Sequence, residues 1–201
     1  VAAIQASAFV GGMAAVGVVT LVAALVRNTD RTLTLVLIGV VIGALAGAAT
    51  SLLKVMADPY DQLPAITFWL LGSLAAITTE DIRPALPLVL LGLVPLVLLR
   101  WRINVLSLGD EEARALGVEV GRTRFLVIAA ATLITASVTA LAGVVGWVGL
   151  VIPHIARMLV GPGFGRLLPT SVLIGAAYLL IVDTAARLMA QTEVPLGILT
   201  A

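Results

Sequence analysis

Charged side chains gather in one segment of this chain, from Leu106 to Arg124, where seven of nineteen residues are ionisable. In chain order they are Asp110, Glu111, Glu112, Arg114, Glu119, Arg122 and Arg124. Each would cost about 3 kcal/mol or more in hydrocarbon, so the segment must lie in water. The chemistry that such a segment offers is charge recognition of a partner. The alternatives are a solvated connector and an amphipathic segment on lipid headgroups.

Residues for catalysis or metal binding are scarce elsewhere. His154 is the only histidine and there is no cysteine, so we expect a structural, hydrogen-bonded histidine and no metal site. The adjacent Pro153 should bend its helix and free a carbonyl that His154 or Arg157 could satisfy. The phosphate-binding pattern GxxxxGK[ST] is absent, and the single lysine, Lys54, reads as an anchor at a membrane boundary. We therefore expect no enzymatic activity and no cofactor on this chain.

The composition indicates a membrane protein. Hydrophobic residues make up 61% of the 201 residues, charged residues only 11%, and the mean hydropathy is +1.16. A net charge of +1 without a basic run argues against a nucleic-acid partner. The chain starts at Val1 with no signal peptide in view, which suggests a fragment or a processed form.

Long apolar runs predict an all-α, polytopic bundle of about six membrane helices. Runs long enough to cross about 30 Å of hydrocarbon are Phe9–Val26, Leu33–Val55, Pro84–Leu99, Phe125–Ala142 and Leu167–Ala186. Val148–Val160 is a shorter sixth candidate, entered through a glycine-rich stretch. The runs are continuous and lack the alternation of barrel strands, so helices are preferred.

The basic residues predict the orientation. Nine of the twelve fall in three alternate loops: Arg27, Arg31, Arg100, Arg102, Arg114, Arg122, Arg124, Arg157 and Arg166. The positive-inside rule places these loops in the cytoplasm, and requires Val148–Val160 to cross. Asp58, Glu80, Arg187 and Glu193 then lie on the outer side.

Two helical patterns add candidate sites. Gly39, Gly43 and Gly47 repeat every fourth residue and predict a smooth helix face, for close helix packing or for lining a conduit. In the charged loop, Gly109 and Gly117 bracket good helix formers with acids in the first turn, which predicts a short surface helix over Asp110–Leu116.

Three segments together resemble the FecCD family of ABC-importer permeases: FWLLGSL at 68–74, LSLGDEEARALGV at 106–118 and GWVGLVIPHIAR at 146–157. LLPTSVLIGAAYLLIVDTAARL at 167–188 and EVPLGILTA at 193–201 continue the resemblance over the whole chain. It implies one permease domain over residues 1–201, equivalent to helices four to nine and the start of the tenth in a ten-helix subunit of the bacterial inner membrane.

The resemblance also implies partners. A permease homodimer would bind two cytoplasmic ATPase subunits, which hold ATP and Mg, and an extracytoplasmic binding protein. Residues 104–122 would form the cytoplasmic coupling loop, with ATPase contacts at Leu106, Leu108, Gly109, Asp110, Glu111, Arg114, Leu116 and Gly117. Arg187 would contact an acid of the binding protein, or pair locally with Asp183 at i and i+4. The glycine face would lie near the translocation path.

The expected function is therefore inward passage of an iron chelate by alternating access, with a siderophore as first choice and haem or cobalamin as the others. The alternative is an ion-coupled secondary transporter, which needs acids buried mid-span. Asp183 is the single acidic candidate within a predicted span, which counts against that alternative. A structural membrane subunit without transport activity is a third interpretation. The sequence does not identify the chelate.

Overall fold

The computed structural model describes residues 2–26, 31–75, 77–189 and 194–200. Within these ranges the chain is helical and contains no strand, which confirms the predicted all-α polytopic class. Five of the described helices are long and apolar enough to cross a membrane. They are α1 (Ala2–Leu25), α2 (Arg31–Met56), α4 (Thr79–Leu98), α7 (Val120–Ala142) and α9 (Phe164–Met189). All five predicted long spans are therefore present.

The remaining helices are shorter. They are α3 (Gln62–Leu71), α5 (Arg100–Leu106), α6 (Asp110–Ala115), α8 (Val148–Val160) and α10 (Leu196–Leu199). The sequence predicted α6 and α8 within a residue of their observed bounds, but it did not predict α3, α5 or α10. The 13 residues of α8 extend only about 20 Å, less than the thickness of the hydrocarbon core.

All five long helices begin earlier than the apolar runs suggested, as α4 and α7 illustrate. Thr78 forms a capping box with Asp81, so α4 starts at Thr79 and includes Pro84 in its second turn. The helix α7 starts at Val120, before its apolar run, and its first two turns contain the charged residues Arg122 and Arg124. Hydropathy located the hydrocarbon-facing part of each helix, whereas capping and turn residues set its ends.

Small residues form the contact between α4 and α7, which pack closely with each other. Gly92 of α4 is buried, and a side chain there would meet Ile134 and the carbonyl of Ala130. On α7, Ala130, Ala136 and Ala140 are buried. The hydrophobic effect does not drive helices together inside a membrane. Small side chains let two helix backbones approach closely, and van der Waals contacts then hold them together. The other face of α7 packs on α1, and α8 packs on α9.

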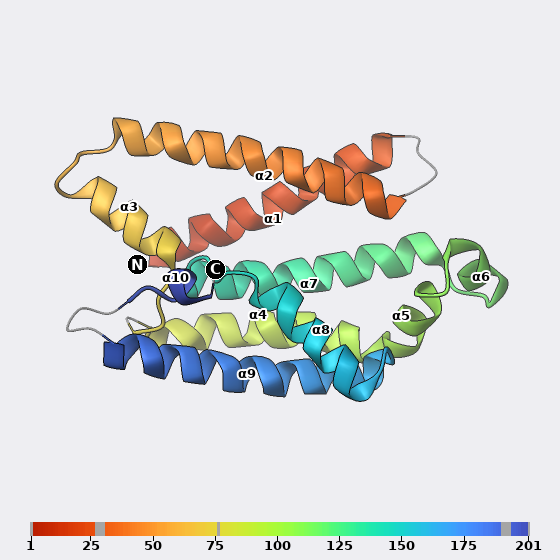
Figure 1. Cartoon of the computed structure of the whole chain (residues 1–201). Helices are drawn as coiled ribbons and strands as arrows, with labels where there is room; N and C mark the ends of the chain where they lie inside the picture. The colour runs from red at the N-terminus through yellow and green to blue at the C-terminus, as the bar shows by residue number, and fades with distance from the viewer. Residues whose placement is uncertain (1, 27–30, 76, 190–193, 201) are drawn as a thin grey trace.

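The long helices run lengthwise through the bundle, and the short helices α3, α5, α6 and α10 lie toward its two ends (Figure 1). One end, called here the α6 end, contains α5, α6 and the start of α7; the other, called the α3 end, contains α3 and α10. Asp58 and Glu80 are next to α3 or at the start of α4, and so lie opposite α6, as the predicted topology requires. Arg27 and Glu193, which entered the count of loop charges, lie outside the described residues.

Candidate functional site

The helix α6 lies between two glycines with positive φ. Gly109 precedes it with a φ of 124°, and Gly117 follows it with a φ of 80°. At Gly109 a side chain would be strained and would also meet the carboxylate of Glu112. Asp110, Glu111 and Glu112 occupy the first turn, where the helix dipole favours negative charge. The predicted surface helix is confirmed.

A small apolar core holds α6 against its neighbours. Ala113 is fully buried, and it clusters with Val105, Val118 and Val120 from α5, the following turn and α7. Leu106 packs on this cluster. The amide of Val118 donates to the carbonyl of Ala113 at 2.9 Å, which closes the turn. Residues 105–120, the predicted coupling segment, therefore form a packed unit with its own core.

An ion pair fixes the same unit to α7. Arg124 donates both terminal nitrogens to Asp110, at 2.6 and 3.2 Å. The side chains are 22% and 33% exposed, so water screens the pair only in part. A bidentate fork restrains orientation as well as distance. This pair ties the first residue of α6 to the second turn of α7.

The outward face of α6 matches part of the predicted docking set. Leu108 and Leu116 are 61% and 54% exposed, and Glu111 and Arg114 are exposed. Neither charged side chain has a hydrogen bond or ion pair within the described residues. Two predicted contact residues lie elsewhere: Leu106 faces the internal core, and the Asp110 carboxylate is bound by Arg124. The available contact surface is thus narrower than the sequence suggested.

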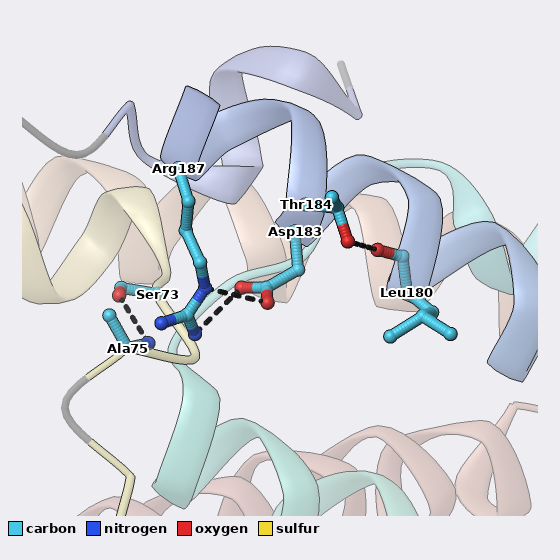
Figure 2. Close-up of polar contacts among 6 residues, drawn as sticks. All are labelled: Ser73, Ala75, Leu180, Asp183, Thr184 and Arg187. Atoms are coloured by element: carbon cyan, nitrogen blue, oxygen red, sulfur yellow. Dashed lines mark hydrogen bonds and ion pairs between the residues drawn. The ribbon is translucent and has the colours of Figure 1, made fainter. Parts of the chain in front are cut away.

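At the α3 end, Arg187 pairs with Asp183 one turn earlier on α9. Arg187 Nε and Nη2 donate to the two carboxylate oxygens at 2.9 and 3.2 Å. Figure 2 shows both side chains directed toward the chain at Ser73 and Ala75. Asp183 is 17% exposed, whereas Arg187 remains 50% exposed. The predicted local pair is present, and the Arg187 side chain stays half exposed.

Backbone hydrogen bonds join three distant segments at this end, and we call them the α3–α10 junction. The amide of Leu196 donates to the carbonyl of Gly72 at 2.9 Å, and that of Ser73 donates to Ala142 at 3.0 Å. The Thr200 hydroxyl accepts from the amide of Gly146 at 2.9 Å. Residues 72–73, 142–146 and 196–200, which are separate in sequence, therefore meet at this junction.

The glycine face of α2 is open in this chain. Side chains built at Gly39, Gly43 and Gly47 would meet no atom within 4 Å in the described structure. These glycines therefore do not pack closely on a neighbouring helix within the described part of this chain. Packing on another chain and lining of a conduit both stay as predictions.

Helix α8 runs without interruption through Pro153. Its buried residues, Ile152 and Ala156, face α9 at a spacing of four. His154 is exposed. Within the described residues neither the His154 nor the Arg157 side chain makes a hydrogen bond, and the expected role of Pro153 and His154 in bending the helix stays a prediction. No group of three His, Cys, Asp or Glu side chains capable of holding a metal occurs among those residues either.

Comparison with known proteins gives consistent results. The model of the FecCD transport family matches residues 1–201. The molybdate import system permease protein MolB of Haemophilus influenzae is 44% identical over 174 residues, which cover 87% of this chain and 52% of that protein. The cobalamin import system permease protein BtuC of Halobacterium salinarum is 42% identical over 198 residues, covering 98% and 53%. The hemin transport system permease protein HmuU of Yersinia pestis is 38% identical, covering 83% and 50%.

A solved structure of a metal-chelate type ABC transporter in an inward-facing conformation superimposes with a TM-score of 0.86. Sequence identity is 38%, and the match covers 98% of this chain and 69% of that one. The chain spans about half the length of the curated relatives it matches.

Proposed function

Because the chain belongs to the FecCD transport family, we propose that it acts as the permease part of an ABC importer for an iron chelate. It is a multi-pass protein of the bacterial inner membrane. A siderophore complex is the first choice of cargo, with haem and cobalamin as the others. The relatives described above are named for molybdate, cobalamin and hemin, so cargo choice within the family is broad.

The observation that best supports the proposal is the exposure of side chains on α6 and directly beside it. Leu108, before α6, and Leu116, after it, offer apolar contact, and Glu111 and Arg114 of α6 offer two charges of opposite sign. Protein interfaces combine apolar contacts with charged residues in this way. We propose that this face docks on a cytoplasmic ATPase subunit that binds ATP and Mg.

The packing beneath α6 suggests how movement of that subunit would reach the membrane. The core around Ala113 and the Asp110–Arg124 pair attach α6 to α7. The helix α7 in turn packs against α4 and α1. A displacement of α6 would then move α7 together with both neighbours, which is the rigid-body change that alternating access requires. The cargo crosses without chemical change.

The complete assembly is proposed as a homodimer with two ATPase subunits and an extracytoplasmic binding protein. In this assembly the half-exposed Arg187 would contact an acid of the binding protein, while Asp183 holds its side chain in place. The glycine face of α2, open in this chain, would meet the second permease copy or the passing cargo.

The test is uptake into proteoliposomes that contain the permease as encoded in its own genome, with the ATPase and binding protein. We expect uptake of an iron siderophore to require both ATP and the binding protein. Hemin, cobalamin and molybdate serve as alternative cargoes. Uptake that continues without ATP and stops with a proton or sodium ionophore would instead support the ion-coupled alternative, against which the ion pairing of Asp183 already argues.

A matched pair of variants tests the docking face. Glu111→Lys with Arg114→Glu reverses both free charges, and should lower ATPase co-purification and uptake by about tenfold or more. Glu119→Lys with Arg122→Glu reverses an exposed neighbouring pair, joined at 3.4 Å, and should have little effect. Equal effects from the two double variants would contradict specific docking through α6.

A further inference from the structure

Two arginines line one hollow at the α6 end of the bundle. Arg100 begins α5 and Arg166 lies in the first turn of α9, and both border a hollow of about 550 Å³ together with Trp101 and Asn104. The amide of Phe164 donates to Asn104 Oδ1 at 2.8 Å, which holds the start of α9 against α5. The relative position of the two arginines is thus fixed by the fold.

No acid of the described structure neutralises these arginines. The ion pairs within the described ranges use Arg122, Arg124 and Arg187, and neither Arg100 nor Arg166 makes one. The walls of the hollow include no Asp or Glu side chain. Two positive charges therefore face a space that would attract an anion.

An apolar groove of about 470 Å³ continues from the hollow along the helices. Leu93 and Val97 of α4 form one side, and Leu168, Val172 and Leu173 of α9 form the other. Arg100 and Gly165 border both the hollow and the groove, so the two spaces are adjacent. From Arg100 to Leu93 the helix rises about 10 Å, enough for the upper part of an acyl chain.

We propose that the hollow and the groove form a binding site for an anionic phospholipid of the cytoplasmic leaflet. The phosphate would lie between Arg100 and Arg166, and an acyl chain would follow the groove. Basic pockets between membrane helices on the cytoplasmic side suit such headgroups, and a tryptophan such as Trp101 is typical of the interface. Zwitterionic lipids bring an ammonium group that the two arginines would repel. A free phosphate would leave the apolar groove unfilled.

This site lies next to the coupling segment. The helix α5 contributes Arg100 and Trp101 to the hollow, and its Val105 belongs to the core beneath α6. A bound lipid would therefore hold α5 in position and support the base of α6. The stability of α5 and α6 would then depend on the fraction of anionic lipid in the membrane, which is a property separate from cargo transport.

The experiment uses Trp101 as the reporter. Trp69→Phe with Trp147→Phe leaves Trp101 as the single tryptophan of these 201 residues, and any tryptophan of the permease outside them is also replaced by Phe. The protein is reconstituted in phosphatidylcholine vesicles that contain a brominated lipid. Brominated phosphatidylglycerol should quench Trp101 at a lower mole fraction than brominated phosphatidylcholine. Arg100→Gln with Arg166→Gln should reduce this preference by about tenfold, since two basic contacts are lost. Arg83→Gln, at the opposite end of α4, should leave it unchanged.

A second pair of variants tests the groove. Val172→Phe partly fills it and should weaken quenching by phosphatidylglycerol, whereas Ile181→Phe, on α9 outside the groove, should not. Equal quenching by the two brominated lipids would overturn the proposal. So would an absence of quenching by either lipid, which would mean that a protein segment or a second copy fills the groove. A preference that inorganic phosphate abolishes and Val172→Phe leaves intact would indicate a simple anion site, and would also refute it.

Discussion

The ion pair between Arg124 and Asp110 should determine how firmly α6 is held to α7. Its two hydrogen bonds, at 2.6 and 3.2 Å, join side chains that are about a quarter to a third exposed. A fully exposed pair would contribute below about 1 kcal/mol, and a buried charged hydrogen bond about 1.5–3 kcal/mol. The partial burial places the expected loss for Arg124→Gln at about 1–2 kcal/mol.

Local stability of α6 is the quantity to measure. A loss of this size corresponds to an increase of about five- to thirtyfold in the opening equilibrium. Hydrogen exchange of the peptide that contains residues 110–118 should accelerate by that factor in Arg124→Gln. Arg124→Lys should give an intermediate value, because lysine keeps the charge but cannot form the two-nitrogen fork.

Arg122→Gln is the matched control. Arg122 lies two residues away, and its pair with Glu119 has both side chains at least 70% exposed. Its loss should change exchange little. If Arg124→Gln leaves exchange of residues 110–118 at the wild-type rate, or if Arg122→Gln has the same effect, then the ion pair does not anchor α6.

Three further predictions concern other parts of the chain. Gly43→Leu should leave the thermal stability of the solubilised chain unchanged, because a side chain at residue 43 meets open space, but it should lower uptake. Normal uptake would mean that this face of α2 contacts lipid. Arg187→Glu should weaken binding-protein association, less so at high salt; normal association, with lost stability rescued by Asp183→Arg, would restrict Arg187 to its local pair. Gly143→Ala, at a φ of 72° and against a backbone carbonyl, should cost about 1–3 kcal/mol in an unfolding measurement, whereas Gly11→Ala, in open space within α1, should cost nothing.

Hydropathy was sufficient to predict the long helices, because a membrane requires continuous apolar runs. It located the five long spans and α8. It did not predict α3, whose ten residues are too few to cross, or α5, which starts at Arg100 and continues directly from α4 with a change of direction at Leu99. A short helix at a bundle end forms because of its contacts with neighbouring segments. Its own sequence is too short to show a helical repeat of apolar residues.

The candidate site was predictable only where its signal is local. Gly109 and Gly117 mark the ends of α6, and these lie next to it in sequence. The pairing of Asp110 with Arg124 joins residues 14 apart across a turn, so no i,i+4 pattern indicates it. Without that contact, Asp110 seemed as available for a partner as Glu111. The arginine hollow likewise combines α5 with α9 and has no sequence signature.

The α3–α10 junction has a consequence for the order in which the protein is made. The carbonyl of Gly72 accepts a hydrogen bond from the amide of Leu196, and the amide of Gly146 donates one to the hydroxyl of Thr200. In both bonds the partner is made much later in translation. Translation supplies Leu196 and Thr200 only after α9 has been made, 54 residues after Gly146 in the case of Thr200. Until then, polar backbone groups at this end must be hydrated or held by other partners. Contacts so distant in sequence form slowly, so the α3 end should mature later than the α6 end, whose core joins residues close together in the sequence.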